Sequence, residues 1–268
     1  HSEARAVKGG ENDRAYLFGT DGDDVLVSSP KKNTLVSEGY TSSAKTFERY
    51  YVHAQDGNDR AMLFDSKLDD RFVAKHDNAR LFNDDYFIKV NDFDKVDAYS
   101  SSGGADRAYF YDSVGDDTLI SLENETRLFG SGFDNTSHGF ARQYTHAING
   151  GNDTAYVYDT DGADTYKLQD NISKMYGTGY YSWMRDFETT ETRFASANRH
   201  ARAIVFGTID DSTMDEVGNL SSIINEYGSY YIYDVAAQEA SGATDNDDEA
   251  FLSIAEDIFE LIPDYNGA

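Results

Sequence analysis

The 268-residue chain contains no cysteine, only two prolines and a single tryptophan. The absence of cysteine excludes a disulfide framework and a thiolate metal site. No apolar run approaches the ~20 residues that a membrane helix needs, so we expect no membrane insertion. No lysine or arginine follows Arg202, whereas 15 acidic residues follow position 208.

Charge of one sign dominates the chain. It carries 49 acidic against 23 basic side chains, a formal net charge of −26. Binding to nucleic acid through phosphates needs a basic surface, so we expect no nucleic-acid partner. An acidic surface instead suits the binding of divalent cations.

The remaining composition indicates an all-β protein with tight turns. Tyrosine and phenylalanine number 20 and 16, glycine 22, and the apolar runs are short. The chain begins at His1 rather than at methionine, which we interpret as a processed mature protein or an excised domain.

A tandem repeat organises the sequence. The segment Asn12–Phe18 returns in similar form near residues 58, 105 and 152, and in decayed form near 202; its alanines step by 46, 47, 47 and 48 residues. Three further columns keep nearly the same step: Asp24, Asp70, Asp117 and Asp164; Leu35, Leu81, Leu128 and Met175; Phe47, Phe93, Phe140 and Phe187. We therefore predict a parallel β-solenoid of four repeats of roughly 47 residues.

Each repeat contains four short strand-like runs separated by Gly, Asp, Asn and Ser. In the third repeat these runs are 108–111, 118–121, 127–130 and 140–146. Four strands fit one wide coil or two coils of about 23 residues, and the usual size of solenoid coils favours two.

Alternation along a strand predicts which side chains face the core. In the first run Ala15 and Leu17 share one face, and the corresponding apolar pairs of the later repeats extend it into a stacked column. Tyr16 and Phe18 then face outward. The outward aromatic positions predict a ladder along the solenoid: Phe18, Phe64, Tyr111 and Tyr158.

The period fails after about residue 208, which divides the chain into a solenoid over 1–208 and an acidic C-terminal cap over 209–268. Within the cap, Glu249–Ile262 is predicted to form an amphipathic helix that Pro263 ends. Solenoids need such caps to cover their last coil. The alternative is a docking surface for a partner or a neighbouring subunit.

Recurring Gly/Asn-Asp turns, such as Gly22-Asp23-Asp24 and Gly115-Asp116-Asp117, carry the clearest motif. They resemble the calcium-binding RTX repeats of secreted bacterial proteins, and more closely the degenerate Gly-Asn-Asp repeats of large bacterial surface proteins. The turns here lie 11 or 12 residues apart rather than nine. The resemblance implies a secreted or cell-surface protein and Ca²⁺ bound by carboxylates, with these candidate ligands: Asp24, Asp70, Asp116, Asp117, Asp153 and Asp164. Alternatively, the aspartates bond backbone N–H groups in Asx turns.

The last run of the repeat offers a second candidate site. Arg142, Tyr144 and His146 would project from one face of a strand. An Arg to neutralise a uronate, with Tyr and His for proton transfer, is the set that a polysaccharide lyase needs. Ligand-binding candidates of the same type are Arg49, Tyr51, His53 and Arg127, the last in a basic column with Arg80 and Lys174. The alternative is that these cations pair with neighbouring acids.

The segment Tyr176–Trp183 contains the only tryptophan and is predicted to be a loop. Tyr180 and Trp183 could stack on a sugar ring or fill the gap where the cap meets the last coil.

Two functions follow as expectations. The first is a non-catalytic, extracellular structural or adhesive module, supported by Ca²⁺ and able to stack into filaments through its unlike ends. The second is a secreted lyase acting on an acidic polysaccharide. A regular repeat without a unique polar cluster favours the first.

Overall fold

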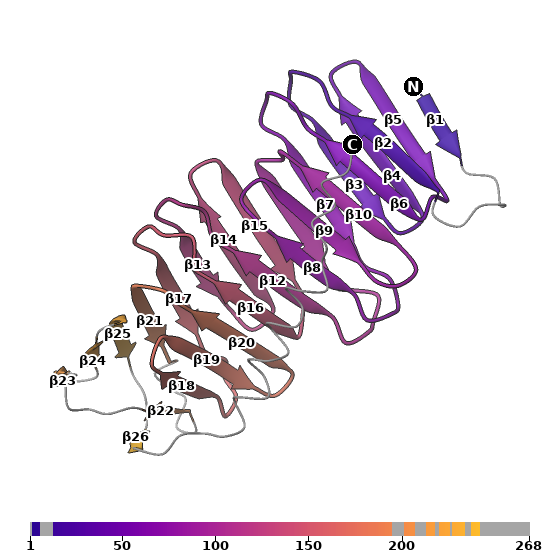
Figure 1. The fold of residues 1–268 in the computed structure, drawn as a ribbon. Coiled ribbons are helices and arrows are strands. Elements are labelled where there is room, and N and C mark those ends of the chain that lie inside the picture. Colours follow the sequence, from indigo (N-terminus) through magenta and orange to yellow (C-terminus); the bar gives the residue numbers. More distant parts are fainter. Residues whose placement is uncertain are drawn as a thin grey trace.

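A computed structural model shows an elongated all-β protein whose strands stack along its long axis (Figure 1). The structure describes residues 2–5, 13–194, 201–206, 213–217, 220–225, 227–233 and 237–241. None of these residues forms a helix, so this part of the chain holds no helix long and apolar enough to cross a membrane.

Five repeats follow a short first strand, β1 (Ser2–Arg5). Repeat 1 contains β2 (Arg14–Phe18), β3 (Val25–Ser29), β4 (Lys32–Ser37), β5 (Tyr40–Lys45) and β6 (Arg49–His53). Repeat 2 contains β7 (Arg60–Phe64), β8 (Arg71–Ala74), β9 (Asn78–Phe82), β10 (Phe87–Asn91) and β11 (Lys95–Tyr99). Repeat 3 contains β12 (Arg107–Tyr111), β13 (Thr118–Ser121), β14 (Glu125–Gly130), β15 (Phe133–His138) and β16 (Arg142–His146).

The same five-strand order continues to the end of the described chain. Repeat 4 contains β17 (Thr154–Tyr158), β18 (Thr165–Gln169), β19 (Ile172–Gly177), β20 (Tyr180–Arg185) and β21 (Thr189–Arg193). Repeat 5 contains β22 (Arg202–Phe206), β23 (Thr213–Val217), β24 (Leu220–Asn225), β25 (Gly228–Tyr233) and β26 (Ala237–Ser241).

Each repeat thus has five strands rather than the predicted four. The missed strand is the third of an antiparallel meander, such as β15 in repeat 3. In repeats 1, 3 and 4 it follows a tight turn at a glycine with positive φ, namely Gly39 (70°), Gly132 (83°) and Gly179 (88°), a backbone conformation that other residues rarely adopt. Its polar sequence, Phe133-Asp-Asn-Thr-Ser-His138, hid it from a search for apolar runs.

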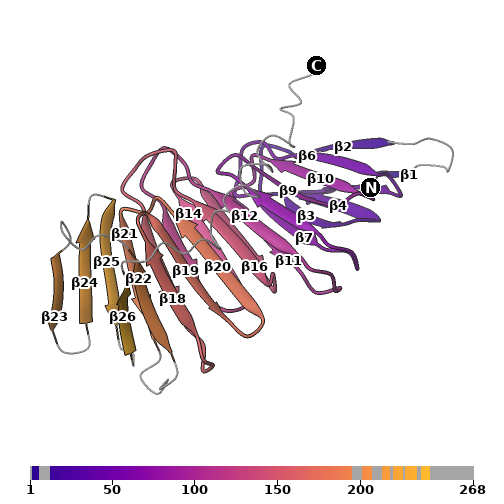
Figure 2. The same ribbon diagram turned by 60° about the horizontal axis from the view of Figure 1, so that its bottom comes forward.

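Two sheets of fourteen and twelve strands enclose the core (Figure 2). In each repeat the three-stranded meander lies in one sheet, and the first and fifth strands lie in the other. The two sheets exchange these roles from one repeat to the next. Repeat 1, for example, has β3–β5 in the fourteen-stranded sheet, whereas repeat 2 has β8–β10 in the twelve-stranded sheet.

The coil of the solenoid therefore differs from the sequence repeat. Parallel partners on successive turns lie 35 to 40 residues apart, as in Arg14 with Arg49 and Thr189 with Ser229. The sequence repeats after 46 to 48 residues instead. The prediction of two 23-residue coils per repeat is wrong, because the antiparallel meander lengthens each repeat without completing a turn.

The predicted fold class is confirmed: the protein is an all-β solenoid in which parallel pairs join successive turns. Both sheets continue past residue 208, since β23 to β26 add strands to them. The predicted boundary between solenoid and cap therefore falls inside repeat 5. The predicted helix over 249–262 lies outside the described residues.

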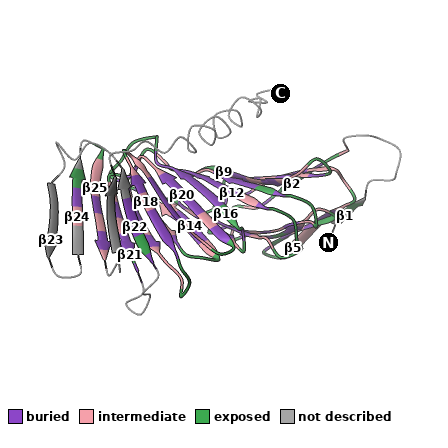
Figure 3. Cartoon of the chain, turned by 90° about the horizontal axis from the view of Figure 1, so that it is seen from below, coloured by how far each residue is buried: buried purple, intermediate pink, exposed green. Residues whose placement is uncertain are grey.

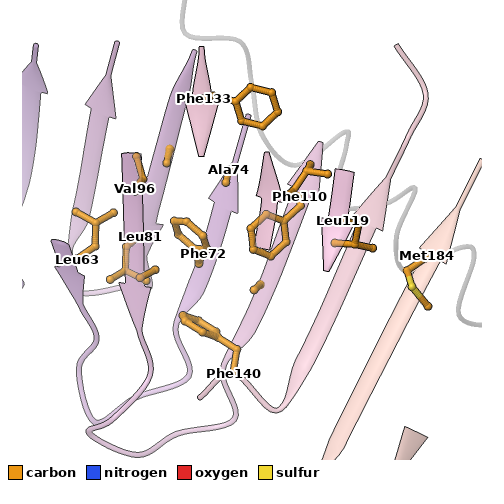
Figure 4. Packing of buried hydrophobic residues seen from close by; sticks show 14 of the residues in the cluster. Leu63, Phe72, Ala74, Leu81, Val96, Phe110, Leu119, Phe133, Phe140 and Met184 are labelled. Carbon is orange, nitrogen blue, oxygen red and sulfur yellow. The ribbon is translucent and has the colours of Figure 1, made fainter. Parts of the chain in front are cut away.

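The inward-facing residues form one continuous core between the sheets. Phe72 packs edge-on against Phe110, with ring centroids 5.7 Å apart, and against Phe140 at 6.0 Å (Figure 4). Each of these three side chains is nearly inaccessible to solvent. Burying one such side chain stabilises the fold by about 1.5–3 kcal/mol.

The inward face of the first strand was predicted correctly, but its stacking was not. Ala15, Ala61, Ala108 and Ala155 are all buried. They lie alternately in the two sheets, on β2, β7, β12 and β17, so they form no single column. The aspartate and outward aromatic columns are divided between the sheets in the same way.

The alternation of inward and outward residues can be tested on β17. Ala155 is fully buried, whereas Thr154 beside it is partly exposed and flanked by Thr118 and Thr189. We expect Ala155→Glu to lower the free energy of unfolding by about 3–5 kcal/mol, because it buries an unpaired charge. Thr154→Glu places the same charge in solvent and should cost far less. Urea unfolding followed by circular dichroism measures both, and equal losses would contradict the assignment.

Candidate functional site

The outward face of the twelve-stranded sheet, from β2 to β22, has an unusual composition. We call it the cationic face, because its outward strand positions carry eleven lysines and arginines and no aspartate or glutamate. The eleven are Arg14, Arg49, Arg71, Arg80, Lys89, Arg107, Arg142, Lys167, Lys174, Arg185 and Arg202. Nearly half of the 23 basic residues of an acidic chain therefore lie on one side of one sheet.

The outward face of the fourteen-stranded sheet differs, because it carries acids as well as cations and several of its cations are paired with them. Arg60 bonds Asp97 at 2.8 Å, and His138 Nε2 lies 3.2 Å from the same carboxylate. Arg127 and Lys95 share the next acid, Asp134, at 2.7 and 3.4 Å. Acids thus neutralise these cations, although Lys32 and Lys45 are register partners elsewhere on the same sheet. On the cationic face Arg185 pairs with Asp186 at 2.6 Å, just beyond the end of β20. The two faces differ in their outward strand positions, which carry no acid on the cationic face.

Like charges lie side by side on the cationic face. Arg71, Arg107 and Arg142 are register partners on the neighbouring parallel strands β8, β12 and β16, and Arg14 pairs with Arg49 in the same way. Like charges directly opposite one another destabilise a sheet. The neighbouring arginines repel one another and give this face a positive potential. A bound anion would reduce the repulsion.

We call the strands β2, β6, β10 and β9 the open part of the cationic face, because their outward side chains are exposed or half-buried. Arg80 and Lys89 are register partners there, on β9 and β10. Burial lowers the pKa of Lys89, and the positive charge of Arg80 lowers it further. Arg80 Nε is buried without a hydrogen-bond partner. These two groups leave one donor unsatisfied and two positive charges close together, which a carboxylate or sulfate group would complement.

Aromatic rings border this cation pair on strands β6 and β10. Tyr51 is the register partner of Lys89, and its ring lies 5.8 Å from that of Phe87. Arg49 lies over the Phe87 ring at 5.7 Å. At the outer edge, Tyr16 stacks on Tyr51 at 5.1 Å and remains 54% exposed. The open part thus combines positive charge with accessible ring surface.

The middle of the cationic face is closed instead of open. Tyr109 stacks on Tyr144 at 5.0 Å, and Tyr111 stacks on His146 at 5.0 Å. The His146 ring also lies 5.0 Å from the ring of Trp183. Burial lowers the pKa of His146 to about 3, with the charge of Arg185 adding to the effect, so this imidazole is neutral at physiological pH.

Arg142, Tyr144 and His146 do lie on the outward side of β16, as predicted. Arg142 is exposed, but the other two are buried in the aromatic cluster. Burial raises the pKa of Tyr144. A proton-transfer catalyst needs a pKa near the working pH and access to substrate, and these two residues have neither.

The predicted ligand-binding residues lie in four different places. Arg49, Tyr51 and His53 lie together on the outward side of β6, in the open part of the cationic face. Arg127 lies on the other sheet, bonded to Asp134, so the predicted column of Arg80, Arg127 and Lys174 does not exist.

Tyr180 and Trp183 form no loop, contrary to the prediction, because both lie in strand β20. Tyr180 faces the core between the sheets, and Trp183 faces outward into the aromatic cluster. The predicted loop is the β19–β20 hairpin, which turns at Gly179.

Lys89 was missed by the sequence analysis. A signal for it was present, since it alternates with the buried Ile88 and Val90 on a strand. Its strand was unassigned, because the run Phe87–Asn91 was read as part of the gap between two apolar runs.

The predicted metal ligands lie at the turns where the chain passes between the sheets. Asp24 Oδ2 accepts the N–H of Thr20 at 2.7 Å, and Asp70, Asp117 and Asp164 accept the equivalent N–H four residues before them. The carboxylates thus bond backbone N–H groups, as the alternative to calcium expected, but each N–H lies four residues before the aspartate rather than two residues after it as in an Asx turn. The four aspartates alternate between the sheets and so do not line one edge.

A second set of carboxylates joins successive turns. Asp94 accepts the N–H of Asp59, whose own carboxylate accepts the N–H of Asp24. Glu188 and Asp153 repeat this arrangement toward Asp117. Asp116, exposed nearby, accepts the N–H of Asn152. Among the described residues no group of three His, Asp or Glu side chains is placed to hold a metal ion, and the calcium site stays a prediction.

Comparison with known proteins adds no family. No protein-family model matches the chain, and no curated protein matches it.

The buried turn carboxylates predict a pH effect. Burial raises the pKa of Asp153 to about 7 from an ordinary 3.8, and its Oδ2 has no hydrogen-bond partner. Because the folded-state pKa is raised, the stability that this group contributes is complete below the unfolded value and is lost as the pH rises through about 7. Asp153→Asn should therefore stabilise the protein more at about pH 8 than at about pH 5.

The difference between variant and wild type isolates Asp153 from other titrating groups such as His146. Asp116→Asn, which alters an exposed carboxylate in the neighbouring turn, is the matched control and should show no such trend. Urea unfolding at the two pH values gives the free energies. A stability difference for Asp153→Asn that does not change with pH would contradict the raised pKa.

Proposed function

We propose that this protein is a non-catalytic, extracellular structural module that adheres to a linear acidic polysaccharide through the open part of the cationic face. The observation that supports this proposal is the segregation of positive charge on one face of the protein. A chain with a net charge of −26 places eleven cations and no acid on the outward strand positions of one sheet from β2 to β22. Like charges side by side destabilise the free protein, and a bound anion would offset this repulsion. The segregation of charge therefore supports anion binding.

The chemistry of the open part fits a charged sugar better than other anions. Arg80 and Lys89 provide donors and charge for a carboxylate or sulfate. Tyr51, Phe87 and Tyr16 provide flat apolar surface beside them, on which the apolar face of a sugar ring can pack. The cationic side chains continue from strand to strand. An extended polysaccharide chain could therefore lie along them, whereas a single small molecule would contact only a few.

Adhesion is favoured over the lyase reaction. The residues with lyase-like chemistry, Tyr144 and His146, are buried, and the pKa of His146 lies far below neutrality. A weak, inaccessible base is a poor acceptor for a sugar C5 proton. The same three-residue pattern also occurs at Arg49, Tyr51 and His53, which suits repeated binding positions better than one active site.

Self-assembly belongs to the same proposal. The two sheets end in β1 and β23, and in β2 and β26, among the described strands. Terminal strands present backbone groups that can pair with another chain. Because the two ends differ, head-to-tail contact would give a filament; light scattering at increasing concentration tests this, and a monodisperse monomer throughout argues against it.

Binding can be measured by isothermal titration with oligouronates from alginate or pectate, and with a sulfated glycosaminoglycan. We expect Lys89→Gln to weaken binding about tenfold, the loss of one charge-assisted hydrogen bond. Lys95→Gln is the matched control, since that lysine lies on the other sheet beside Asp134. Affinity should fall with added salt, and neutral dextran should not bind.

Three results would contradict the proposal. They are equal affinities of the Lys89 and Lys95 variants, equal binding of single-stranded DNA, and a rise in absorbance from unsaturated uronates during incubation. The last result would support the lyase reaction in place of adhesion.

Calcium support is tested separately by thermal melting in CaCl₂ and in EGTA. The aspartate turns predict a higher midpoint with Ca²⁺, because ion binding to the folded state alone stabilises it. An unchanged midpoint leaves the backbone hydrogen bonds of Asp24, Asp70 and Asp117 as the whole role of these carboxylates.

A further inference from the structure

The open part of the cationic face has a counterpart two repeats further along the chain. Its strands β2, β6, β10 and β9 correspond to β12, β16, β20 and β19, which follow one another in the same order in the same sheet. Figure 3 shows β2, β9, β12, β16 and β20 in one layer of the molecule. Each strand lies five strand positions from its counterpart, which is ~24 Å at about 4.8 Å per strand. We call the open part the first unit and its counterpart the second unit.

One row of outward side chains has the same composition in both units. In each unit, two neighbouring arginines are followed by two aromatic rings, and none of these side chains is fully buried. The register partners in the first unit are Arg14, Arg49, Phe87 and Phe82. Those in the second unit are Arg107, Arg142, Tyr181 and Tyr176.

The two aromatic pairs of this row are arranged alike. The ring centroids of Phe82 and Phe87 lie 5.9 Å apart, and those of Tyr176 and Tyr181 lie 6.3 Å apart. Each pair therefore provides ring surface beside a pair of arginines, which is the combination that the first unit offers to a charged sugar.

The next row of outward side chains separates the two units. Tyr16 is exposed and Tyr51 half-buried in the first unit, whereas the equivalent Tyr109 and Tyr144 are buried in the second. The accessible contacts of the second unit are thus those of the row of arginines and aromatic rings.

The row continues without interruption from one unit to the other. Arg71 is the register partner of Phe82 on one side and of Arg107 on the other. The cations of the row from β2 to β16 are all arginines, whose planar guanidinium groups bind a carboxylate through two parallel hydrogen bonds. A row of such groups along the long axis matches carboxylates that recur along an extended chain.

We propose that the second unit is a further binding site for the acidic polysaccharide, and that one extended uronate chain lies along the row and occupies both units. This inference rests on the proposed function, which supplies the ligand. Binding at one unit makes binding at the other intramolecular, so a chain that spans ~24 Å binds more tightly than a short fragment of the same chemistry.

Two lengths of pectate fragment test the inference in the unmodified protein. A uronate trisaccharide is too short to contact both units, whereas a dodecasaccharide is long enough to cover them. By isothermal titration, we expect two trisaccharides to bind per protein chain. We expect one dodecasaccharide to bind per chain, at least about tenfold more tightly.

Paired substitutions show which residues form the second unit. Arg107→Gln combined with Arg142→Gln should reduce the trisaccharide stoichiometry from two to one and remove the advantage of the dodecasaccharide. The matched control is Lys32→Gln combined with Lys45→Gln, which removes two cations that are register partners on the other sheet. The control should change neither quantity, and circular dichroism checks that both variants keep the fold.

The possible failures are distinguishable. One trisaccharide per chain, with equal affinity for both lengths, would overturn the second unit and leave the proposed adhesion at the first unit intact. An equal loss of the length advantage in the arginine and lysine variants would also overturn it, because net charge would then account for the effect. Absence of binding at either length would overturn the proposed function and this inference together.

Discussion

The architecture depends on the odd number of times that each repeat crosses between the two sheets. The chain crosses from the first strand to the meander, from the meander to the fifth strand, and from there to the next repeat. Three crossings leave the next repeat starting in the opposite sheet. Every position of the repeat consequently appears on both sheets in alternation, and the true period of each surface is two repeats.

This alternation explains how one sheet acquires a surface that the other lacks. Arg49, Tyr51 and His53 recur 93 residues later as Arg142, Tyr144 and His146, on the same sheet. The intervening fifth strand, β11, lies on the other sheet and carries Asp97 at the tyrosine position. Two surfaces can therefore differ in charge while sharing one set of inward residues, because inward positions serve the same core from either side.

The acidic composition of the chain and its cationic face are compatible for the same reason. Many of the acids lie in the turns, where they accept backbone N–H groups, or on the fourteen-stranded sheet beside cations. Net charge predicts long-range attraction or repulsion, but contact with a ligand depends on local potential. The strand alternation collects cations on one side of one sheet, so the local charge of that face is positive although the net charge of the chain is negative.

The sequence by itself determined the all-β class, the repeat and the inward face of the first strand. These depend on local periodicity, since alternation fixes which side of a strand is buried and glycine and aspartate fix the turns. The outward grouping of Arg49, Tyr51 and His53 follows from the same alternation, and it too was predicted correctly.

Only the tertiary structure decided which repeats share a sheet, and with it the composition of the site. Arg80 and Lys89 become neighbours through an antiparallel pairing, and Arg127 is separated from Arg80 by a sheet crossing. The step of 35 to 40 residues between parallel partners has no counterpart in the repeat of 46 to 48. Pairing between distant strands sets it, because backbone hydrogen bonds are alike for every side chain and leave no mark in the sequence period.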